Sequence, residues 1–287
     1  AQAALALRAL GGLTTAQIAR AFLEAEPATA QRLVRARRKI LEARVAYEVP
    51  GPEDLPARLA AVLATIYLVF NEGYAAASGP SLVRADLCAE AIALARLLVQ
   101  LLPAEPEAQG LLALLLLHDA RRAGRIDASG ALVPLEEQDR AGWDRERIAE
   151  GLAERALTLH RRGPYQVQAA VAALHARAPT ARQTDWHQIA ALYGALLEMA
   201  PTPVVELNAA AACAMAHGPE KGLDWISRLE ARGELAGYHL LPAAKADLLR
   251  RSGRHPEARQ AYEAALSLAR QPAEIAYLRR RWVAVAA

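Results

Sequence analysis

The sequence has few aromatic side chains and very few cysteines. Aromatic residues make up 5% of the 287 residues, whereas apolar residues together make up 54%. Alanine and leucine supply most of this apolar surface, which favours helices packed closely through small residues over a β-sandwich. The two cysteines, Cys88 and Cys213, lack CxxC spacing. This pattern argues against a disulfide framework and predicts a reduced, cytoplasmic chain.

Long apolar runs and catalytic signatures are also missing. No run of 18 apolar residues is free of charge, so the sequence predicts no membrane-spanning helix. The seven histidines form neither HExxH nor H-x3-H, and no GxxxxGK[ST] or GxGxxG loop occurs. No serine or cysteine lies in a nucleophile elbow. We therefore expect no metal site and no cofactor, and we predict that the chain is not an enzyme.

Positive charge is concentrated near the start of the chain. Residues 1–49 hold eight cations and four anions, a net charge of +4, while the whole chain carries +3. The other 238 residues therefore carry −1. The basic character of the protein is thus a local property of its first segment, and it indicates an anionic partner there.

Residues 10–41 predict two helices joined by a short turn. Thr14 is the expected N-cap of a first helix that buries Ile18, Ala19 and Phe22. Residues 23–26 make the turn, and a proline at position 27 suits the first turn of the second helix. The residues of the second helix that we expect to face inward are Leu33, Ala36, Ile40 and Leu41.

The outward face of the second helix carries a row of cations. The residues that we predict to contact DNA are Gln31, Arg32, Arg35, Arg37, Arg38 and Lys39. Arginines on a helix can bind phosphates or read base edges in the major groove. The alternative is a solvated charged face on an ordinary helical hairpin. The turn, the small residue Ala19 and the row of cations together favour a helix-turn-helix.

A proline-rich segment separates this module from a long helical region. Residues 48–56 contain three prolines and form the predicted linker. Helical periodicity follows almost throughout, apart from a hairpin expected at 125–133 with Ser129-Gly130 at its turn. The predicted helices lie near 56–77, 82–102, 105–123, 145–160, 165–178, 185–199, 203–216, 220–231, 239–252, 255–269 and 272–284.

The last third of the chain shows a spacing typical of tetratricopeptide repeats. Two sets of residues share intervals of 12, 4 and 3, and they lie 36 positions apart. The sets are Ala210, Gly222, Ile226, Leu229 and Ala246, Ala258, Tyr262, Ala265. We predict a tetratricopeptide-like solenoid from about residue 185, whose concave surface suits a protein or peptide.

The module and several later blocks resemble one protein family. Leu13-x4-Ile18-Ala19 with Arg32-Leu33-x-Arg35-Ala36-Arg37 is similar to region 4 of bacterial sigma factors, and most similar to extracytoplasmic-function (ECF) sigma factors with a helical C-terminal extension. The resemblance continues at residues 47–50, 68–74, 118–122, 135–144, 163–170 and 237–243. It therefore spans nearly the whole chain.

The resemblance implies particular partners. Region 4 binds the promoter −35 element, and its apolar part docks on the β flap of core RNA polymerase. The candidates for that docking are Leu5, Leu7, Leu10, Leu13 and Phe22, whose alternative role is the core of the module. The chain begins at Ala1 without the polymerase-binding region of such factors, so we expect a fragment. Thr29 lies one position from the usual threonine of the recognition helix.

Polar blocks beside apolar helices supply candidates for contacts between the two parts. These interdomain or regulatory candidates are Asn71, Glu72, Tyr74, His118, Asp119, Arg121 and Arg122. We expect Glu72 to pair with an arginine of either domain, with residues 118–122 the nearest candidates in the sequence. The alternative is a buried network of hydrogen bonds and ion pairs that fixes the register of the helices.

The sequence therefore predicts an all-α protein in three parts. Residues 1–47 form the helix-turn-helix, residues 48–56 the linker, and residues 57–287 the helical extension. The favoured function is that of a sigma factor fragment whose extension regulates activity or contacts the holoenzyme. Two alternatives stay open: a one-component regulator whose helical domain binds a ligand or protein, and an α-helical enzyme that uses the polar blocks.

Overall fold

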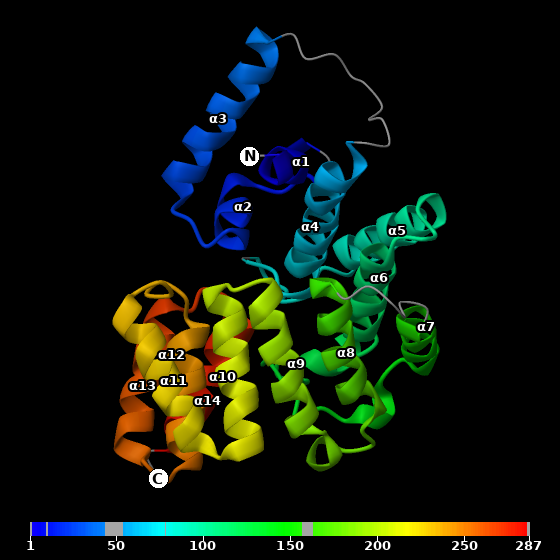
Figure 1. The fold of residues 1–287 in the computed structure, drawn as a ribbon. Helices are drawn as coiled ribbons and strands as arrows, with labels where there is room; N and C mark the ends of the chain where they lie inside the picture. The colour runs from blue at the N-terminus through cyan, green and yellow to red at the C-terminus, as the bar shows by residue number, and fades with distance from the viewer. Residues whose placement is uncertain (1, 10, 44–53, 78, 157–162, 286–287) are drawn as a thin grey trace.

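Helices fill the described part of the chain, which is all-α as predicted (Figure 1). The computed structural model describes residues 2–9, 11–43, 54–77, 79–156 and 163–285, and these ranges contain no strand. The first helices are α1 (Gln2–Ala9), α2 (Thr15–Ala21), α3 (Glu26–Glu42), α4 (Leu55–Tyr74), α5 (Ala85–Leu101) and α6 (Pro106–Asp119). They are followed by α7 (Arg145–Ala156), α8 (Pro164–Arg177), α9 (Trp186–Met199), α10 (Pro203–His217), α11 (Pro219–Arg232), α12 (Leu240–Arg251), α13 (His255–Leu268) and α14 (Pro272–Ala284).

Three short 3-10 helices complete the helical elements of the described ranges. They are η1 (Arg122–Arg125), η2 (Arg140–Gly142) and η3 (Ala181–Gln183). The helix predicted over 105–123 is therefore too long, because α6 ends at Asp119 and a separate 3-10 turn follows. The described helices are also too short or too polar to span a membrane.

The start of α2 follows from its capping residues. Thr14 accepts a hydrogen bond from the Gln17 N–H, and the Gln17 side chain accepts one from the Thr14 N–H, which completes a capping box. Ile18 and Ala19 are buried as predicted. Leu23 ends the turn after α2 with φ of 53°, a left-handed conformation that leucine rarely adopts.

The apolar core runs from the first helices into the extension. Ala4, Leu7, Leu13 and Ile18 share one cluster with residues of α4, α5 and α6. The division into a separate module and extension stays a prediction, since residues 44–53 lie outside the described ranges. That gap includes most of the predicted linker, and α4 begins at Leu55.

The helices after α4 pack in sequence, and the two ends of this series meet. Gln271, at the start of α14, donates a hydrogen bond to the Ser81 carbonyl in the loop between α4 and α5 (3.1 Å). Leu132 donates its backbone N–H to the Ala273 carbonyl (3.1 Å). The start of α14 therefore contacts both the α4–α5 loop and the segment after α6.

The predicted hairpin in the segment after α6 is present as a single bridge. Ile126 and Leu132 form an antiparallel β-bridge, and the Gly130 N–H binds the Asp127 carbonyl. Gly130 has φ of 82°, as a tight turn at this position requires. Four ion pairs connect the region around this hairpin to α12 and α14: Arg251–Glu136, Arg280–Asp127, Arg280–Glu137 and Arg281–Glu137.

Candidate nucleic-acid interface and junction cavity

The predicted DNA-contacting residues of α3 are mostly exposed, at one end of the molecule (Figure 1). Gln31, Arg35, Arg37, Arg38 and Lys39 are all exposed. Arg38 forms an i,i+4 pair within the helix (3.3 Å). Within the described ranges no carboxylate pairs with Arg35, Arg37 or Lys39, so these three cations are available to an anionic partner.

Arg32 differs from the other cations of α3 because it is held to the preceding turn. Its Nη1 lies 2.6 Å from Oε1 of Glu24, and its guanidinium carbon lies 4.8 Å from the centre of the Phe22 ring. The other oxygen of Glu24 accepts a hydrogen bond from the buried Thr29 hydroxyl (2.9 Å). Arg32 thus helps to fix the angle between α2 and α3, and its contact with DNA stays a prediction.

The second half of α3 exposes apolar side chains. Ile40 is 46% exposed and Leu41 is 68% exposed, so the expectation that both face inward is wrong. Val34 is also 67% exposed. Leu33 does pack against the core, but the helix continues beyond the residues that could cover its later turns. Helical periodicity predicts a shared face and says nothing about where the neighbouring surface ends.

The residues proposed to dock on polymerase are largely part of the core. Leu7 and Leu13 are fully buried, and Phe22 packs against the same cluster. Leu5 is half-buried, while position 10 lies outside the described residues. Their docking role stays a prediction, and their observed role is to join the first helices to α4.

Glu72 connects α4 to α2. Its Oε1 accepts a hydrogen bond from the Gln17 side chain (2.8 Å), and both of its oxygens accept from the Ala77 N–H (3.2 Å). In the described ranges Glu72 forms no ion pair, so the expected pairing with an arginine, residues 118–122 included, is wrong: its carboxylate is bonded to α2 and to its own loop. Burial raises the pKa of Glu72, partly opposed by these hydrogen bonds and by the nearby cations.

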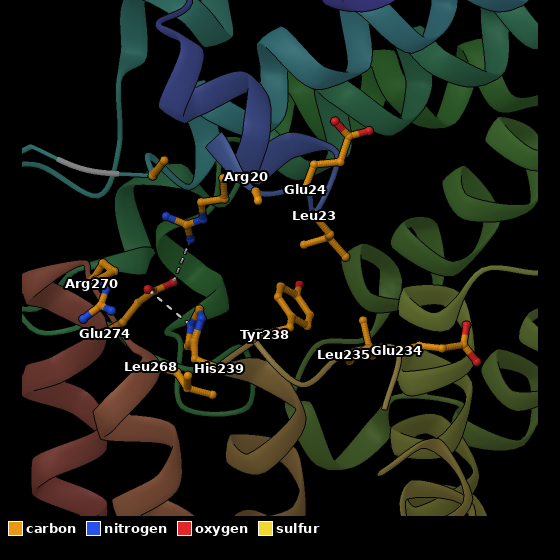
Figure 2. A pocket seen from close by; sticks show the side chains of 13 residues that line it. Arg20, Leu23, Glu24, Glu234, Leu235, Tyr238, His239, Leu268, Arg270 and Glu274 are labelled. Atoms are coloured by element: carbon orange, nitrogen blue, oxygen red, sulfur yellow. Dashed lines mark ion pairs between the residues drawn. The ribbon is translucent and has the colours of Figure 1, made fainter. Parts of the chain in front are cut away.

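Arg20 extends the contact from α2 to the far end of the chain. Its Nη1 donates to the Ala76 carbonyl (3.3 Å), and its Nη2 lies 3.9 Å from Oε1 of Glu274 on α14. The other oxygen of Glu274 lies 3.3 Å from Nε2 of His239. Figure 2 shows Arg20 and His239 approaching Glu274 from opposite sides. Three distant parts of the chain therefore meet at one carboxylate.

A cavity of about 520 Å³ opens beside this carboxylate (Figure 2). Its walls come from α2 and the following turn, the α4–α5 loop, the α11–α12 loop, and the ends of α13 and α14. Arg20 and Glu274 lie on one side, whereas Leu23 and Leu235 lie on the other, with Tyr238 between them. We call this space the junction cavity. It separates α2 from the C-terminal helices.

A second polar cluster lies around Tyr74. The Tyr74 ring stacks on Phe70, with centroids 5.5 Å apart, and meets the His118 ring edge-on at the same separation. The guanidinium carbon of Arg125 lies 3.8 Å from the centre of the Tyr74 ring, and that of Arg121 lies 5.8 Å from it. Arg121 also donates from Nη2 to Nδ1 of His118 (2.5 Å). The structure thus brings three of the predicted candidates together and adds Arg125.

The histidines of this region are held neutral. Burial lowers the pKa of His118 well below its usual value, and Arg121 lowers it further. Burial likewise lowers the pKa of His175 to about 3, with added effects of Arg121 and Arg140. A neutral imidazole can accept the hydrogen bond that Arg121 donates to His118. The cluster therefore resembles the buried network that the sequence offered as an alternative.

The other predicted candidates are structural in this geometry. The buried Asp119 carboxylate pairs with Arg122 (3.0 Å) and with Arg147 of α7. Asn71 lies one turn after Tyr67 on α4, and the Tyr67 hydroxyl donates to Gln168 of α8 (3.5 Å). Asp119 thereby fixes the contact between α6 and α7.

Sequence reasoning missed several residues that position these sites. Arg20 and Glu274 carried no motif, and their pairing depends on the whole extension. His239 lies in the block 237–243, and no local pattern in that block predicts its place near α2. Arg140 lies in the polar block 138–140 and donates to the carbonyls of His175 and Ala178, a contact that no sequence pattern predicts.

Comparison with known proteins gives a relationship but no activity. A family of unknown function (DUF6596) matches residues 58–158. An uncharacterized protein of Rhizobium meliloti (strain 1021) is 51% identical over 280 residues, which is 97% of this chain and 66% of that protein. The chain thus spans just under two thirds of that relative's length. No solved structure matches the chain.

The matched family region contains much of the polar cluster. Residues 58–158 include Tyr74, His118, Arg121 and Arg125. They include neither α3 nor the C-terminal wall of the junction cavity. The descriptions of both matches name no activity, substrate or partner.

Proposed function

We propose that this chain is the promoter-recognising part of an ECF-type RNA polymerase sigma factor. In this proposal α2 and α3 form a helix-turn-helix that binds the −35 element. The helical extension regulates the factor or contacts the holoenzyme. The partners are promoter DNA, the β flap of core polymerase, and a protein or peptide on the extension. The place of action is the cytoplasm, and the chain itself catalyses no reaction.

The observation that carries this proposal is the exposed basic face of α3. Arg35, Arg37 and Lys39 point away from the core without a carboxylate partner in the described ranges. The capping box of α2 and the pair between Arg32 and Glu24 fix the two helices relative to each other. A rigid helix with unpaired cations suits the phosphates and base edges of the major groove.

The packing of the C-terminal helices supports a tetratricopeptide-like extension. Seven of the eight residues with the 12, 4, 3 spacing belong to one buried cluster. The eighth, Gly222, is also buried, in α11. A Cβ on Gly222 of α11 would lie 2.8 Å from the Ala210 carbonyl oxygen of α10. This close approach is what a small residue at a repeat's helix crossing permits.

The DNA-binding proposal predicts different effects for two residues of α3. Arg35→Ala should remove about 1–3 kcal/mol of sequence discrimination if its guanidinium contacts a guanine. Lys39→Ala should weaken binding to all sequences alike and lower the salt slope by about one. Fluorescence anisotropy with a selected −35 duplex and a scrambled duplex, at several salt concentrations, measures both.

A matched control separates these effects from net charge. Arg228 on α11 is exposed and has no ion pair in the described ranges, so Arg228→Ala removes one positive charge far from α3. It should leave DNA binding unchanged. If the two α3 variants bind both duplexes as the wild type does, the assignment of α3 is refuted.

The alternative function is a one-component helix-turn-helix regulator, and the junction cavity favours it because such regulators need a ligand site. Transcription by core polymerase discriminates between the two. The complete natural protein should direct core polymerase to a native promoter, with output that changes when residues 57–287 are removed. DNA binding without any dependence of polymerase on the protein would support the regulator instead.

A further inference from the structure

We propose that the junction cavity binds a small amphipathic anion, a carboxylate with an aromatic or short aliphatic body. The bound molecule would bridge α2 to the C-terminal helices and so set the position of α3. The proposed binding of the anion is inferred from the geometry of the cavity alone. Its effect on α3 rests on the proposed DNA-binding function.

Two of the three carboxylates that line the cavity are engaged by other residues and turned away from it. Glu24 is engaged by Arg32 and Thr29, and Glu234 by Arg232 (2.6 Å). Glu274 faces the cavity between Arg20 and His239. Figure 2 shows Glu24 and Glu234 directed away from the cavity. Their charges therefore do little to oppose an incoming anion.

The same side offers cationic donors. Arg270 lines the cavity, is exposed, and pairs with no carboxylate in the described ranges. Arg20 contacts Glu274 only loosely, at 3.9 Å. A carboxylate is the group that guanidinium donors bind best in a fork geometry. These two arginines therefore favour an anionic group at this end of the cavity.

Buried polar atoms at the cavity also lack hydrogen-bond partners. His239 and Glu274 are both 8% exposed, and the Nε2 of the first and Oε2 of the second make no hydrogen bond despite their 3.3 Å approach. Tyr238 lines the cavity and directs its hydroxyl into it (Figure 2). Burial raises the pKa of Tyr238 to about 12, so it stays a donor at physiological pH. A ligand carboxylate can accept a hydrogen bond from Nε2–H of His239, whereas Oε2 of Glu274 needs a donor such as a bound water.

The opposite side of the cavity accepts an apolar body. Leu23 and Leu235 contribute apolar side chains to the lining there, whereas Leu268 lies beside His239 on the charged side (Figure 2). A volume of about 520 Å³ falls within the range of roughly 300–1,000 Å³ that small-molecule sites occupy. Polar donors at one end and leucines at the other match an amphipathic molecule better than a bare inorganic ion.

The test uses the full chain with benzoate and octanoate as probes, and benzamide and octanamide as their uncharged controls. Saturation-transfer NMR and calorimetry measure binding. Gly237 lines the cavity and a Cβ there would meet no atom within 4 Å, so Gly237→Leu adds a large side chain at the lining without a backbone clash. Arg270→Gln removes the unpaired charge, and Arg228→Gln makes the same change elsewhere. Circular dichroism and thermal unfolding verify that each variant is folded.

We expect at least one carboxylate to bind the wild type and the matching amide to bind about tenfold more weakly or worse. Gly237→Leu and Arg270→Gln should each weaken binding at least about tenfold, and Arg228→Gln should not. The proposal is overturned if neither carboxylate binds, if the amides bind as well, or if binding is unaffected by Gly237→Leu.

A second readout tests the link to α2. Hydrogen exchange of the α2 amides should slow when the carboxylate is bound, because the ligand stabilises the contact across the cavity. Unchanged exchange would refute the bridging role. Carboxylate binding that persists in a protein without DNA affinity would reject the sigma factor proposal and leave the binding site intact.

Discussion

Glu72 shows how one buried carboxylate can link two parts of the chain. Replacing it by alanine leaves the Gln17 amide and the Ala77 N–H without their acceptor, so we expect Glu72→Ala to destabilise the protein by about 1–3 kcal/mol. Glu72→Gln keeps an acceptor oxygen and removes a desolvated charge, so it should be close to neutral. Urea unfolding of both variants at pH 7 measures the difference.

The pKa of Glu72 adds a test with a defined sign. Because burial raises its folded pKa above the usual 4.5, the folded state binds a proton more readily than the unfolded state. Its contribution to stability is fully present below pH 4.5 and is lost as pH rises through the folded pKa. The wild type should therefore gain stability relative to Glu72→Gln on acidification from pH 7. A difference that is independent of pH would contradict this.

Leu23 is a second residue with a local consequence. Its φ of 53° is unfavourable for leucine, tolerated by asparagine, and worst for a β-branched residue. The side chain is 47% exposed, so little apolar burial is lost on substitution. We expect Leu23→Val to be less stable than Leu23→Asn by about 1 kcal/mol or more. Equal melting temperatures for the two variants would argue against strain at this turn.

At the level of elements, two glycines within helices test close packing. A Cβ on Gly110 of α6 would lie 2.8 Å from the backbone nitrogen of Gln166 on α8, whereas one on Gly194 of α9 would meet nothing within 4 Å. Gly110→Ala should destabilise by about 1–3 kcal/mol because the α6–α8 contact must widen. Gly194→Ala should stabilise by about 0.5–1 kcal/mol through helix propensity. Thermal unfolding distinguishes these opposite signs.

The helices themselves were largely predictable. Pro106, Pro164, Pro203 and Pro272 each occupy the first turn of a helix, as the missing N–H of proline favours. The error at the end of α6 has a local reason: residues 118–122 carry no glycine or proline to signal an end, yet the chain leaves the α-helix at Asp119. There the Asp119 carboxylate is fixed by a later helix.

At the scale of the molecule, a seam of ion pairs joins the region around the hairpin to the C-terminal helices. Individual exposed pairs contribute about 0–1 kcal/mol, so the seam depends on their number. We expect the double variant Glu136→Lys, Glu137→Lys to loosen it, because like charges would then face Arg251 and Arg281. Faster hydrogen exchange at the Leu132 amide, which binds the Ala273 carbonyl, would report the opening.

The control for the seam reverses two charges elsewhere. Glu90 and Glu146 are exposed and form no ion pair in the described ranges, so changing both to lysine alters net charge equally without touching α12 or α14. Exchange at Leu132 should then stay slow. Adding Arg281→Glu to the seam variant should restore part of the protection. An unchanged exchange rate at the Leu132 amide in the seam variant would mean that the backbone hydrogen bond to Ala273, and not the ion pairs, holds this contact.

The sequence by itself determined the helical class, most helix bounds, the turn at Gly130 and the row of cations on α3. These features depend on preferences that act over a few residues, such as capping, proline geometry and helical periodicity. Only the tertiary structure decided that Arg20 meets Glu274, 254 positions away, and that Ile40 lies exposed. Such outcomes depend on the summed crossing angles of many stacked helices and on where the neighbouring surface ends. Local patterns do not encode either quantity, and the junction cavity depends on both.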